Sequence, residues 1–167
     1  MSDYMDAKSK TEKCRIADEE ERIFGEWLEQ RYDNVQHNPK GSYLNRMGVD
    51  YLVLLEDGRV LSIDFKAKNG DSFCFEKQSE WGYKGWIYMQ ERVATDGWTH
   101  YIVTKHGNEY IFTPVDRIRR YVEDNNLPTR PMRLKGEYEA LLPNGNQSQI
   151  GFFSYDILKG MSKTYKI

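Results

Sequence analysis

The feature that most constrains the fold is a pair of apolar segments within residues 48–66. Both segments are rich in Val, Ile, Leu and Tyr, and the short sequence Glu56-Asp57-Gly58 separates them. Two such segments around a turn sequence are typical of a β-hairpin. A three-residue hairpin loop favours glycine at its third position, where the backbone is left-handed, and Gly58 stands there. The sequence therefore predicts a hairpin over residues 48–66.

The loop length decides which residues face each other across this hairpin. A three-residue loop pairs Leu55 with Arg59 and, counted back along both strands, Asp50 with Asp64. A two-residue loop would instead place Asp50 opposite Phe65. The position of the glycine favours the first register.

Two facing carboxylates in such an apolar hairpin need a compensating cation. Directly opposed residues have Cβ atoms about 4.5–5.5 Å apart, and like charges there are destabilising. Lys66 shares a face with Asp64, because side chains alternate along a strand. A divalent metal ion with oxygen ligands would satisfy both Asp50 and Asp64, so the hairpin predicts a metal site. A hairpin whose charges are purely structural is the competing interpretation.

Length and composition indicate a soluble single-domain protein. At 167 residues the chain can bury a substantial core, and no apolar run approaches the ~20 residues of a membrane span. The 2 cysteines and the absence of an apolar leader favour a reducing, cytoplasmic location. The net charge of −2 argues against a general polyanion binder and leaves a local basic patch open. We expect a disordered tail at 1–10, one domain at 11–167 and no membrane association.

The order of predicted elements indicates an α/β sandwich around a mixed sheet. Apolar periodicity and turn residues predict, in chain order, a helix at 11–32, a loop at 33–48, the hairpin, a strand at 73–75, a helix at 79–95, a second hairpin at 99–112, a helix from a Thr113 cap to 125, and a hairpin around 137–153.

Two acidic residues interrupt the apolar rows of the first predicted helix. Glu21 falls in the row of Ala17, Phe24 and Leu28, and Glu20 falls in the neighbouring row. Acidic residues in the first half of a helix interact favourably with the helix dipole, so an ordinary surface charge that stabilises the helix is one interpretation. The other is a carboxylate directed at the hairpin, with Glu20 as the alternative to Glu21.

Taken together, Glu21 on a helix, Asp50 on a strand and Asp64-Phe65-Lys66 ending the next strand resemble the PD-(D/E)xK nuclease superfamily. The resemblance covers roughly residues 17–118 and implies the restriction-endonuclease-like fold. Within the superfamily the chain most resembles the RecU-type Holliday-junction resolvases, through the segments 48–51, 58–59, 64–68, 75–78 and 110–114 and through Gly97.

The chain also departs from the family pattern. Val49 stands where the superfamily name has Pro, and Asp64 replaces the Glu that is more usual in the resolvases. No segment corresponds to the resolvase stalk that reaches into a junction. Junction specificity is therefore not implied.

The resemblance implies a metal-dependent deoxyribonuclease, resolvase-like, acting in recombination or repair. Mg²⁺, or Mn²⁺ in its place, would be held by Asp50, Asp64 and the backbone carbonyl of Phe65, with Glu21 binding directly or through water. Lys66 would orient the attacking water and stabilise the transition state. The alternatives are a restriction endonuclease and a catalytically inert DNA-binding or assembly module of the same fold.

Further residues complete the predicted site. Gln78 resembles a glutamine that positions the nucleophile or substrate in related enzymes, although a polar residue near a helix start explains it equally well. Basic residues near the site are candidates for DNA contacts or plain surface charges, namely Lys68, Lys40, Arg46, Lys77 and Lys84. The resemblance also implies a homodimer, because cutting two strands requires two active sites.

Overall fold

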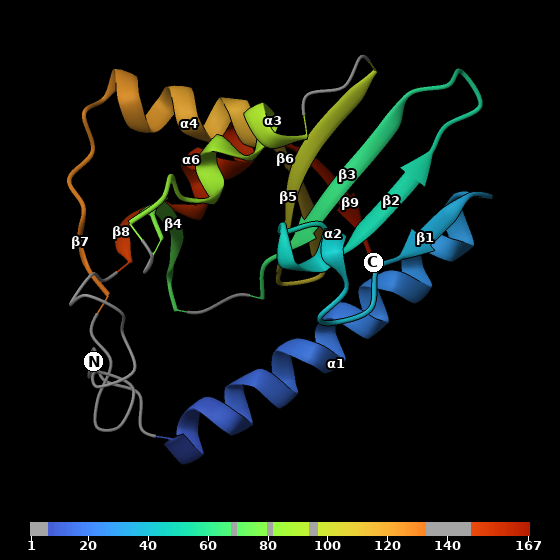
Figure 1. Ribbon diagram of the computed structural model, residues 1–167, viewed down its shortest axis with the longest axis horizontal. Helices are drawn as coiled ribbons and strands as arrows, with labels where there is room; N and C mark the ends of the chain where they lie inside the picture. Colours follow the sequence, from blue (N-terminus) through green and yellow to red (C-terminus); the bar gives the residue numbers. More distant parts are fainter. Residues whose placement is uncertain (1–6, 68–69, 80–81, 94–96, 133–147) are drawn as a thin grey trace.

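The protein has an α/β fold in which helices flank a mixed central sheet (Figure 1). The computed structural model describes residues 7–67, 70–79, 82–93, 97–132 and 148–167. None of the helices in these ranges is long and apolar enough to cross a membrane. The mixed central sheet flanked by helices confirms the α/β class that the sequence predicted.

Within the described ranges the central sheet contains six strands, and its only parallel contact joins β3 to β5. Every other neighbouring pair in this sheet is antiparallel. In spatial order the strands are β1 (Val35–His37), β2 (Tyr51–Leu54), β3 (Val60–Phe65), β5 (Trp98–His106), β6 (Glu109–Pro114) and β9 (Lys163–Lys166).

One face of this sheet is covered by the long helix α1 (Ala7–Arg31). Arg–Glu ion pairs at i,i+3 and i,i+4 spacing stabilise the exposed side of the helix. Its buried side carries Phe24, Trp27 and Leu28 against Ile63 and Phe65 of β3. The rings of Phe24 and Phe65 stack with their centroids 4.9 Å apart. This contact fixes α1 against the strand that carries Asp64.

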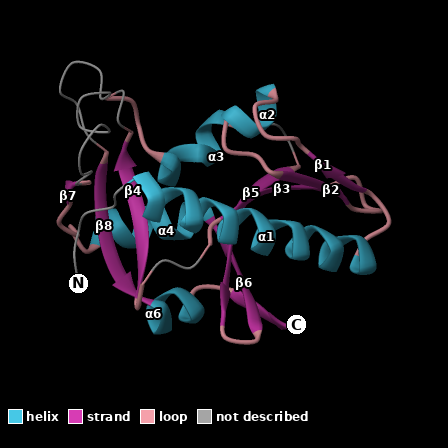
Figure 2. Ribbon diagram, turned by 90° about the horizontal axis from the view of Figure 1, so that it is seen from below, coloured by secondary structure: helices cyan, strands magenta, loops and turns pink. Residues whose placement is uncertain are grey.

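The opposite face is covered by the remaining elements, which form the second half of the core. These are α2 (Tyr43–Arg46), the 3-10 helix η1 (Trp86–Tyr88), α3 (Met89–Arg92), α4 (Val115–Asp124), α6 (Tyr155–Gly160) and a three-stranded antiparallel sheet of β4 (Ser72–Gln78), β8 (Gln149–Ser154) and β7 (Arg130–Pro131). Figure 2 shows β1, β2 and β3 nearly edge-on, with α1 on one side and α2 and α3 on the other.

The predicted hairpin and its register are confirmed. Leu55 and Arg59 flank the loop, with the Leu55 amide donating to the Arg59 carbonyl at 2.9 Å. Gly58 has a φ of 86°, the left-handed conformation that the three-residue loop requires. The second predicted hairpin is also confirmed as β5 and β6.

The single continuous helix predicted at 79–95 is wrong, although part of the segment is helical. In its described part the Ser79 amide donates to the Tyr83 carbonyl at 2.8 Å, and η1 and α3 follow. Gly85 explains the difference, since a Cβ there would lie 2.2 Å from the Glu76 carbonyl oxygen. This close approach of two backbones, with a bridge between Gln78 and Lys84, replaces the helix. The strand predicted at 73–75 is β4, which belongs to the second sheet.

Other boundaries differ from the prediction as well. Helix α1 begins at Ala7, within the predicted tail, and residues 1–6 lie outside the described ranges. The predicted loop at 33–48 contains β1 and α2, and the sequence did not indicate α6 or β9. Pro114 occupies the cap position of α4, because the hydroxyl of Thr113 bonds to Ser162 instead. Most of the predicted 137–153 hairpin falls outside the described residues, but β8 is present.

Candidate functional site

The β2–β3 hairpin brings Asp50 and Asp64 to one end of the central sheet. Tyr51 pairs with Ile63 in the ladder, so the next position outward places Asp50 opposite Asp64. Both carboxylates are buried, with 8% of Asp50 and 4% of Asp64 exposed to solvent. The facing carboxylates that the sequence predicted are therefore present, and solvent solvates neither of them fully.

Asp50 is held rigidly by hydrogen bonds to both carboxylate oxygens. The backbone amide of Phe65 donates to Oδ2 at 2.8 Å, and the side-chain amide of Asn45 donates to Oδ1 at 2.9 Å. Asn45 lies on α2, whose first turn is capped by the Ser42 hydroxyl. The backbone of Asp50 is held as well, since the Asn38 backbone amide donates to the Asp50 carbonyl at 2.8 Å. Asn45 was not predicted from the sequence, because its segment had been assigned to a loop.

Asp64 forms an ion pair with Lys66 on the same face of β3. The Lys66 ammonium nitrogen lies 2.9 Å from Oδ2 of Asp64. This oxygen is fully buried, and no hydrogen bond of good geometry reaches it from the described residues. Burial raises the pKa of Asp64 to about 7, with Asp50 acting in the same direction and Lys66 opposing both. Lys66 is thus the cation that compensates this buried carboxylate among the described residues.

Lys66 remains a cation in this environment. Burial disfavours its charge, but the neighbouring Asp64 carboxylate outweighs this effect and raises the pKa of Lys66. Asp50 and Glu76 act in the same direction as Asp64. The ammonium also lies 5.6 Å from the centre of the Trp86 ring. Glu76 and Trp86 are neighbours of the site that the sequence analysis missed, because they approach from β4 and η1.

Glu21 approaches the hairpin from α1. Burial raises its pKa to about 7, and the charge of Asp50 contributes to this rise. The Tyr51 hydroxyl donates to the Glu21 carbonyl at 3.0 Å, and Gly25 leaves space for the Tyr51 ring. Glu20 instead influences the pKa of Tyr110, which burial raises further. Glu21 rather than Glu20 is therefore the helix carboxylate nearer to Asp50.

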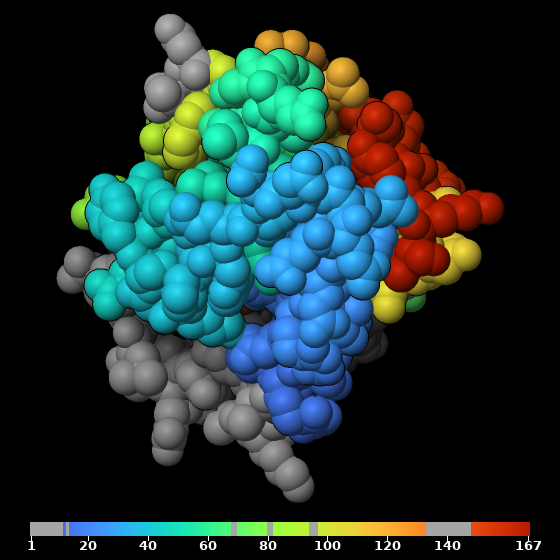
Figure 3. Space-filling view, turned by 90° about the vertical axis from the view of Figure 1, so that its right-hand side faces the viewer, coloured from blue at the N-terminus to red at the C-terminus, as the bar shows by residue number. Residues whose placement is uncertain are grey.

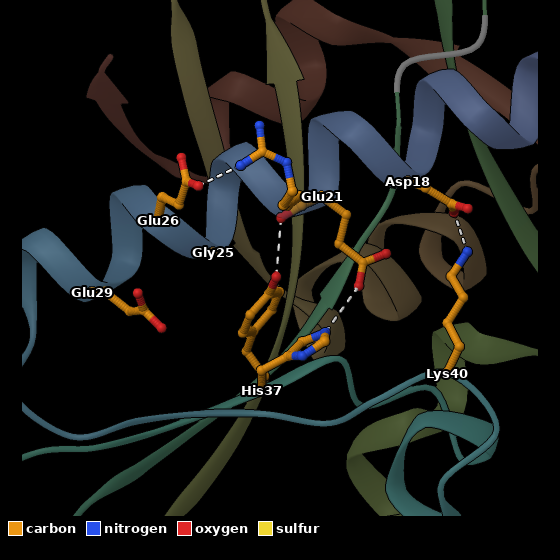
Figure 4. Close-up of a pocket in the computed structure, with 9 residues that line it drawn as sticks. Asp18, Glu21, Gly25, Glu26, Glu29, His37 and Lys40 are labelled. Atoms are coloured by element: carbon orange, nitrogen blue, oxygen red, sulfur yellow. Dashed lines mark hydrogen bonds and ion pairs between the residues drawn. The ribbon is translucent and has the colours of Figure 1, made fainter.

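A cavity of about 360 Å³ opens beside Glu21. Figure 3 shows this face, with α1 in blue beside the light-blue and cyan segment that contains β1 and α2. In Figure 4 Asp18 pairs with Lys40, and His37 lies 3.9 Å from Glu21. The cavity is lined by acidic and basic residues of both signs, namely Asp18, Glu21, Arg22, Glu26, Glu29 and Lys40, together with His37. With its cations next to acids, this cavity is not a preformed anion site.

The donor set at the hairpin end suits a hard cation in its chemistry. Asp50 and Asp64 supply carboxylate oxygens, one of them without a hydrogen bond, which are the ligands that Mg²⁺ prefers. Within the described residues, no three His, Cys, Asp or Glu side chains lie close enough together to form a metal-binding group. Glu21 therefore does not complete a three-carboxylate site in this arrangement. Two carboxylates and a backbone carbonyl remain sufficient for an ion that keeps several waters.

The remaining predicted residues, where they are described, have different contacts. Gln78 ends β4, and Lys77 precedes it, half-buried. Lys84 forms an exposed ion pair with Glu91 at 3.1 Å. Arg46 is exposed at the end of α2. Lys68 lies outside the described residues.

A buried Ser62–His100 pair lies deeper along the same face. Ser62 Oγ and His100 Nδ1 are 2.8 Å apart, and Nε2 of His100 has no hydrogen-bond partner among the described residues. Burial lowers the pKa of His100 to about 3, and the charge of Lys66 acts in the same direction. The imidazole is therefore neutral at physiological pH.

The fold and the site define an α/β protein with a buried carboxylate pair and a lysine at one end of its central sheet. Comparison with known proteins does not narrow this class. No protein-family model matches the chain, and no curated protein matches it significantly.

Proposed function

We propose that the chain is a metal-dependent DNA nuclease of the PD-(D/E)xK type, with the restriction-endonuclease-like fold and resolvase-like chemistry. The observation that carries the proposal is the hairpin register, which sets buried Asp50 opposite buried Asp64 with Lys66 on the same face. Two such carboxylates cost folding free energy, and a bound cation would remove this cost. A lysine at the same place suits a reaction in which negative charge develops on a phosphate.

In this proposal each residue has a distinct task. Asp50 and Asp64, the Phe65 carbonyl and, directly or through water, Glu21 would hold Mg²⁺ or Mn²⁺. When bound, the ion would supply an activated water and neutralise charge on the scissile phosphate. Lys66, kept charged by Asp64, would orient the attacking water and donate to a phosphate oxygen as its charge increases.

Outer residues would hold this arrangement and the substrate in place. Asn45 and the Phe65 amide fix the orientation of Asp50, so its free lone pairs point in constant directions. Gln78 would position the nucleophile or the DNA strand. Lys77, Arg46 and Lys84 would contact phosphates, with Lys40 and Lys68 as further candidates. A homodimer would provide the two active sites needed for two strands.

A cleavage assay tests the proposal. Labelled linear duplex, single-stranded and four-way-junction DNA are incubated with Mg²⁺ or Mn²⁺, beside EDTA. Lys66→Met keeps the size of the side chain and removes its charge, and we expect it to reduce the cleavage rate about 100-fold or more. Asp64→Asn is expected to abolish cleavage. Asp57→Asn, an exposed carboxylate in the turn of the same hairpin, is the matched control and should cut normally.

The outcomes separate the candidate functions. Metal-dependent cutting lost in the Asp64 and Lys66 variants would support the nuclease, and the preferred substrate would choose between resolvase-like and restriction-type activity. DNA binding without cutting would favour the catalytically inert module. One observation favours that alternative: within the described residues, Glu21 does not join the two aspartates in a three-ligand group.

A further inference from the structure

Two tyrosine rings stand out on the surface. Tyr43 is 77% and Tyr83 is 72% exposed, more than any other exposed large hydrophobic side chain in the described ranges. The next value is 52%, for Ile167 at the end of the chain. Neither ring belongs to a core cluster, so packing does not explain them.

Both rings lie on segments that contact the carboxylate–lysine cluster. Tyr43 is the first residue of α2, and Asn45 of the same helix binds Asp50. Tyr83 precedes the short segment that leads to Trp86, whose ring lies beside Lys66. In Figure 1, α2 lies across the lower end of β3, and α3 lies above it and to the left. Figure 2 places α2 and α3 on the same side of the sheet.

A cation accompanies each ring. Arg46 follows Tyr43 by three residues on α2, so the two side chains share a side of the helix. Lys84 is adjacent to Tyr83 in the chain, and its ion pair with Glu91 is exposed. Exposed ion pairs contribute little free energy, so Lys84 can exchange Glu91 for a phosphate at small cost.

Exposed aromatic rings next to cations bind single-stranded nucleic acid through base stacking and phosphate contacts. Bases in a continuous duplex already stack on each other and do not offer their faces to a protein ring. Only unpaired or splayed bases can stack on both tyrosines.

We propose that Tyr43 and Tyr83 form a stacking platform beside the Asp50–Asp64–Lys66 cluster, which directs the enzyme to DNA with unpaired bases. The platform binds the unpaired strand, and Arg46 and Lys84 bind its phosphates. The inference rests on the proposed nuclease function, because the platform is defined by its position around that cluster.

Fluorescence anisotropy with EDTA measures binding separately from cleavage. The probes are a fluorescein-labelled 20-nucleotide single strand, the same sequence as a duplex, and that duplex with a splayed end. We expect the wild type to prefer the single strand and the splayed end. Tyr43→Ala and Tyr83→Ala should each weaken single-strand binding by about 5- to 150-fold and leave duplex binding unchanged. Tyr→Phe at both positions keeps the rings and should retain binding.

Phe152→Ala is the matched control, since it removes an exposed ring on β8, in the second sheet. The inference is overturned if the alanine variants bind the single strand as the wild type does, or if they lose single-strand and duplex binding equally. Cleavage distinguishes this failure from failure of the nuclease proposal. Cutting that persists without ring-dependent binding overturns only the platform, and ring-dependent binding by a protein that cuts no DNA overturns only the nuclease.

Discussion

Replacing Asp64 with asparagine is expected to make the metal-free protein relatively more stable as the pH rises. Burial raises the pKa of Asp64 to about 7, against an ordinary value of 3.8. The native state therefore holds this proton more tightly than the unfolded state does. The resulting stabilisation is complete below pH 3.8 and is lost as the pH rises through 7. Asparagine cannot ionise, so the variant does not undergo this loss.

The magnitude follows from the two pKa values of Asp64. Full ionisation costs the native state about 4 kcal/mol, because one pKa unit corresponds to about 1.4 kcal/mol. About 2 kcal/mol of this is already lost at pH 5, and nearly all of it at pH 8. The difference in unfolding free energy between variant and wild type should therefore grow by about 2–3 kcal/mol from pH 5 to pH 8. The Lys66 ion pair needs no separate allowance, because its effect is already contained in the pKa of Asp64.

Urea denaturation followed by tryptophan fluorescence, in EDTA at pH 5 and pH 8, measures this difference. Asp57→Asn is the control, because Arg59 lowers the pKa of the exposed Asp57 carboxylate. Asp57 is ionised in both states throughout this range, so its variant should differ from the wild type by the same amount at both pH values. A difference for Asp64→Asn that stays constant, or that is larger at pH 5, would refute the reasoning.

Four further expectations follow from the same contacts. Asp50→Asn should lower the unfolding free energy by about 1–3 kcal/mol in urea denaturation. One carboxylate oxygen is replaced by an NH₂ group, which cannot accept the hydrogen bond from the Asn45 side-chain amide or the Phe65 backbone amide. Gly25→Ala should cost about 1–3 kcal/mol, since its Cβ would lie 2.4 Å from the Tyr51 hydroxyl, and adding Tyr51→Phe should recover part of the loss. His100→Leu should remove about 2 kcal/mol of acid destabilisation between pH 7 and 5 in the same assay, because the lowered pKa of His100 makes native stability fall as the pH drops below 6.5. Mn²⁺ at 100 times its dissociation constant should stabilise the wild type by about 2.7 kcal/mol at pH 8, measured by thermal unfolding, and should have no such effect on Asp64→Asn.

The carboxylate pair could be predicted from the sequence because a hairpin is a local structure. The position of Gly58 sets the loop length, and the loop length sets the register over the whole ladder. Counting back from Leu55 and Arg59 was enough to place Asp50 opposite Asp64. Lys66 followed from strand alternation alone.

The surroundings of the pair could not be predicted in the same way, because they depend on long-range packing. Trp86 and Glu76 reach Lys66 only because β4 leaves the central sheet and pairs with β8, far along the chain. Asn45 reaches Asp50 through a single-turn helix that has no periodic pattern to detect. Gly85 indicated a close approach of two backbones, which the structure has, but the apolar spacing of the 79–95 segment favoured a helix there.

The composition of β3 indicates that the polar residues Ser62 and Asp64 are not needed for folding. Its last four residues are all buried, and a strand buried on both faces is normally apolar throughout. Ile63 and Phe65 follow this rule on the side of α1, whereas Ser62 and Asp64 break it on the other side. Ser62 is paired with a neutral His100 and Asp64 with the cation Lys66, so the charge of the row increases toward the C-terminal end of the strand. Local sequence rules are broken most often at functional sites, and here the break ends at the Asp50–Asp64–Lys66 cluster. A row of apolar residues would stabilise the same sheet better, which makes ligand binding the simplest reason for its polarity.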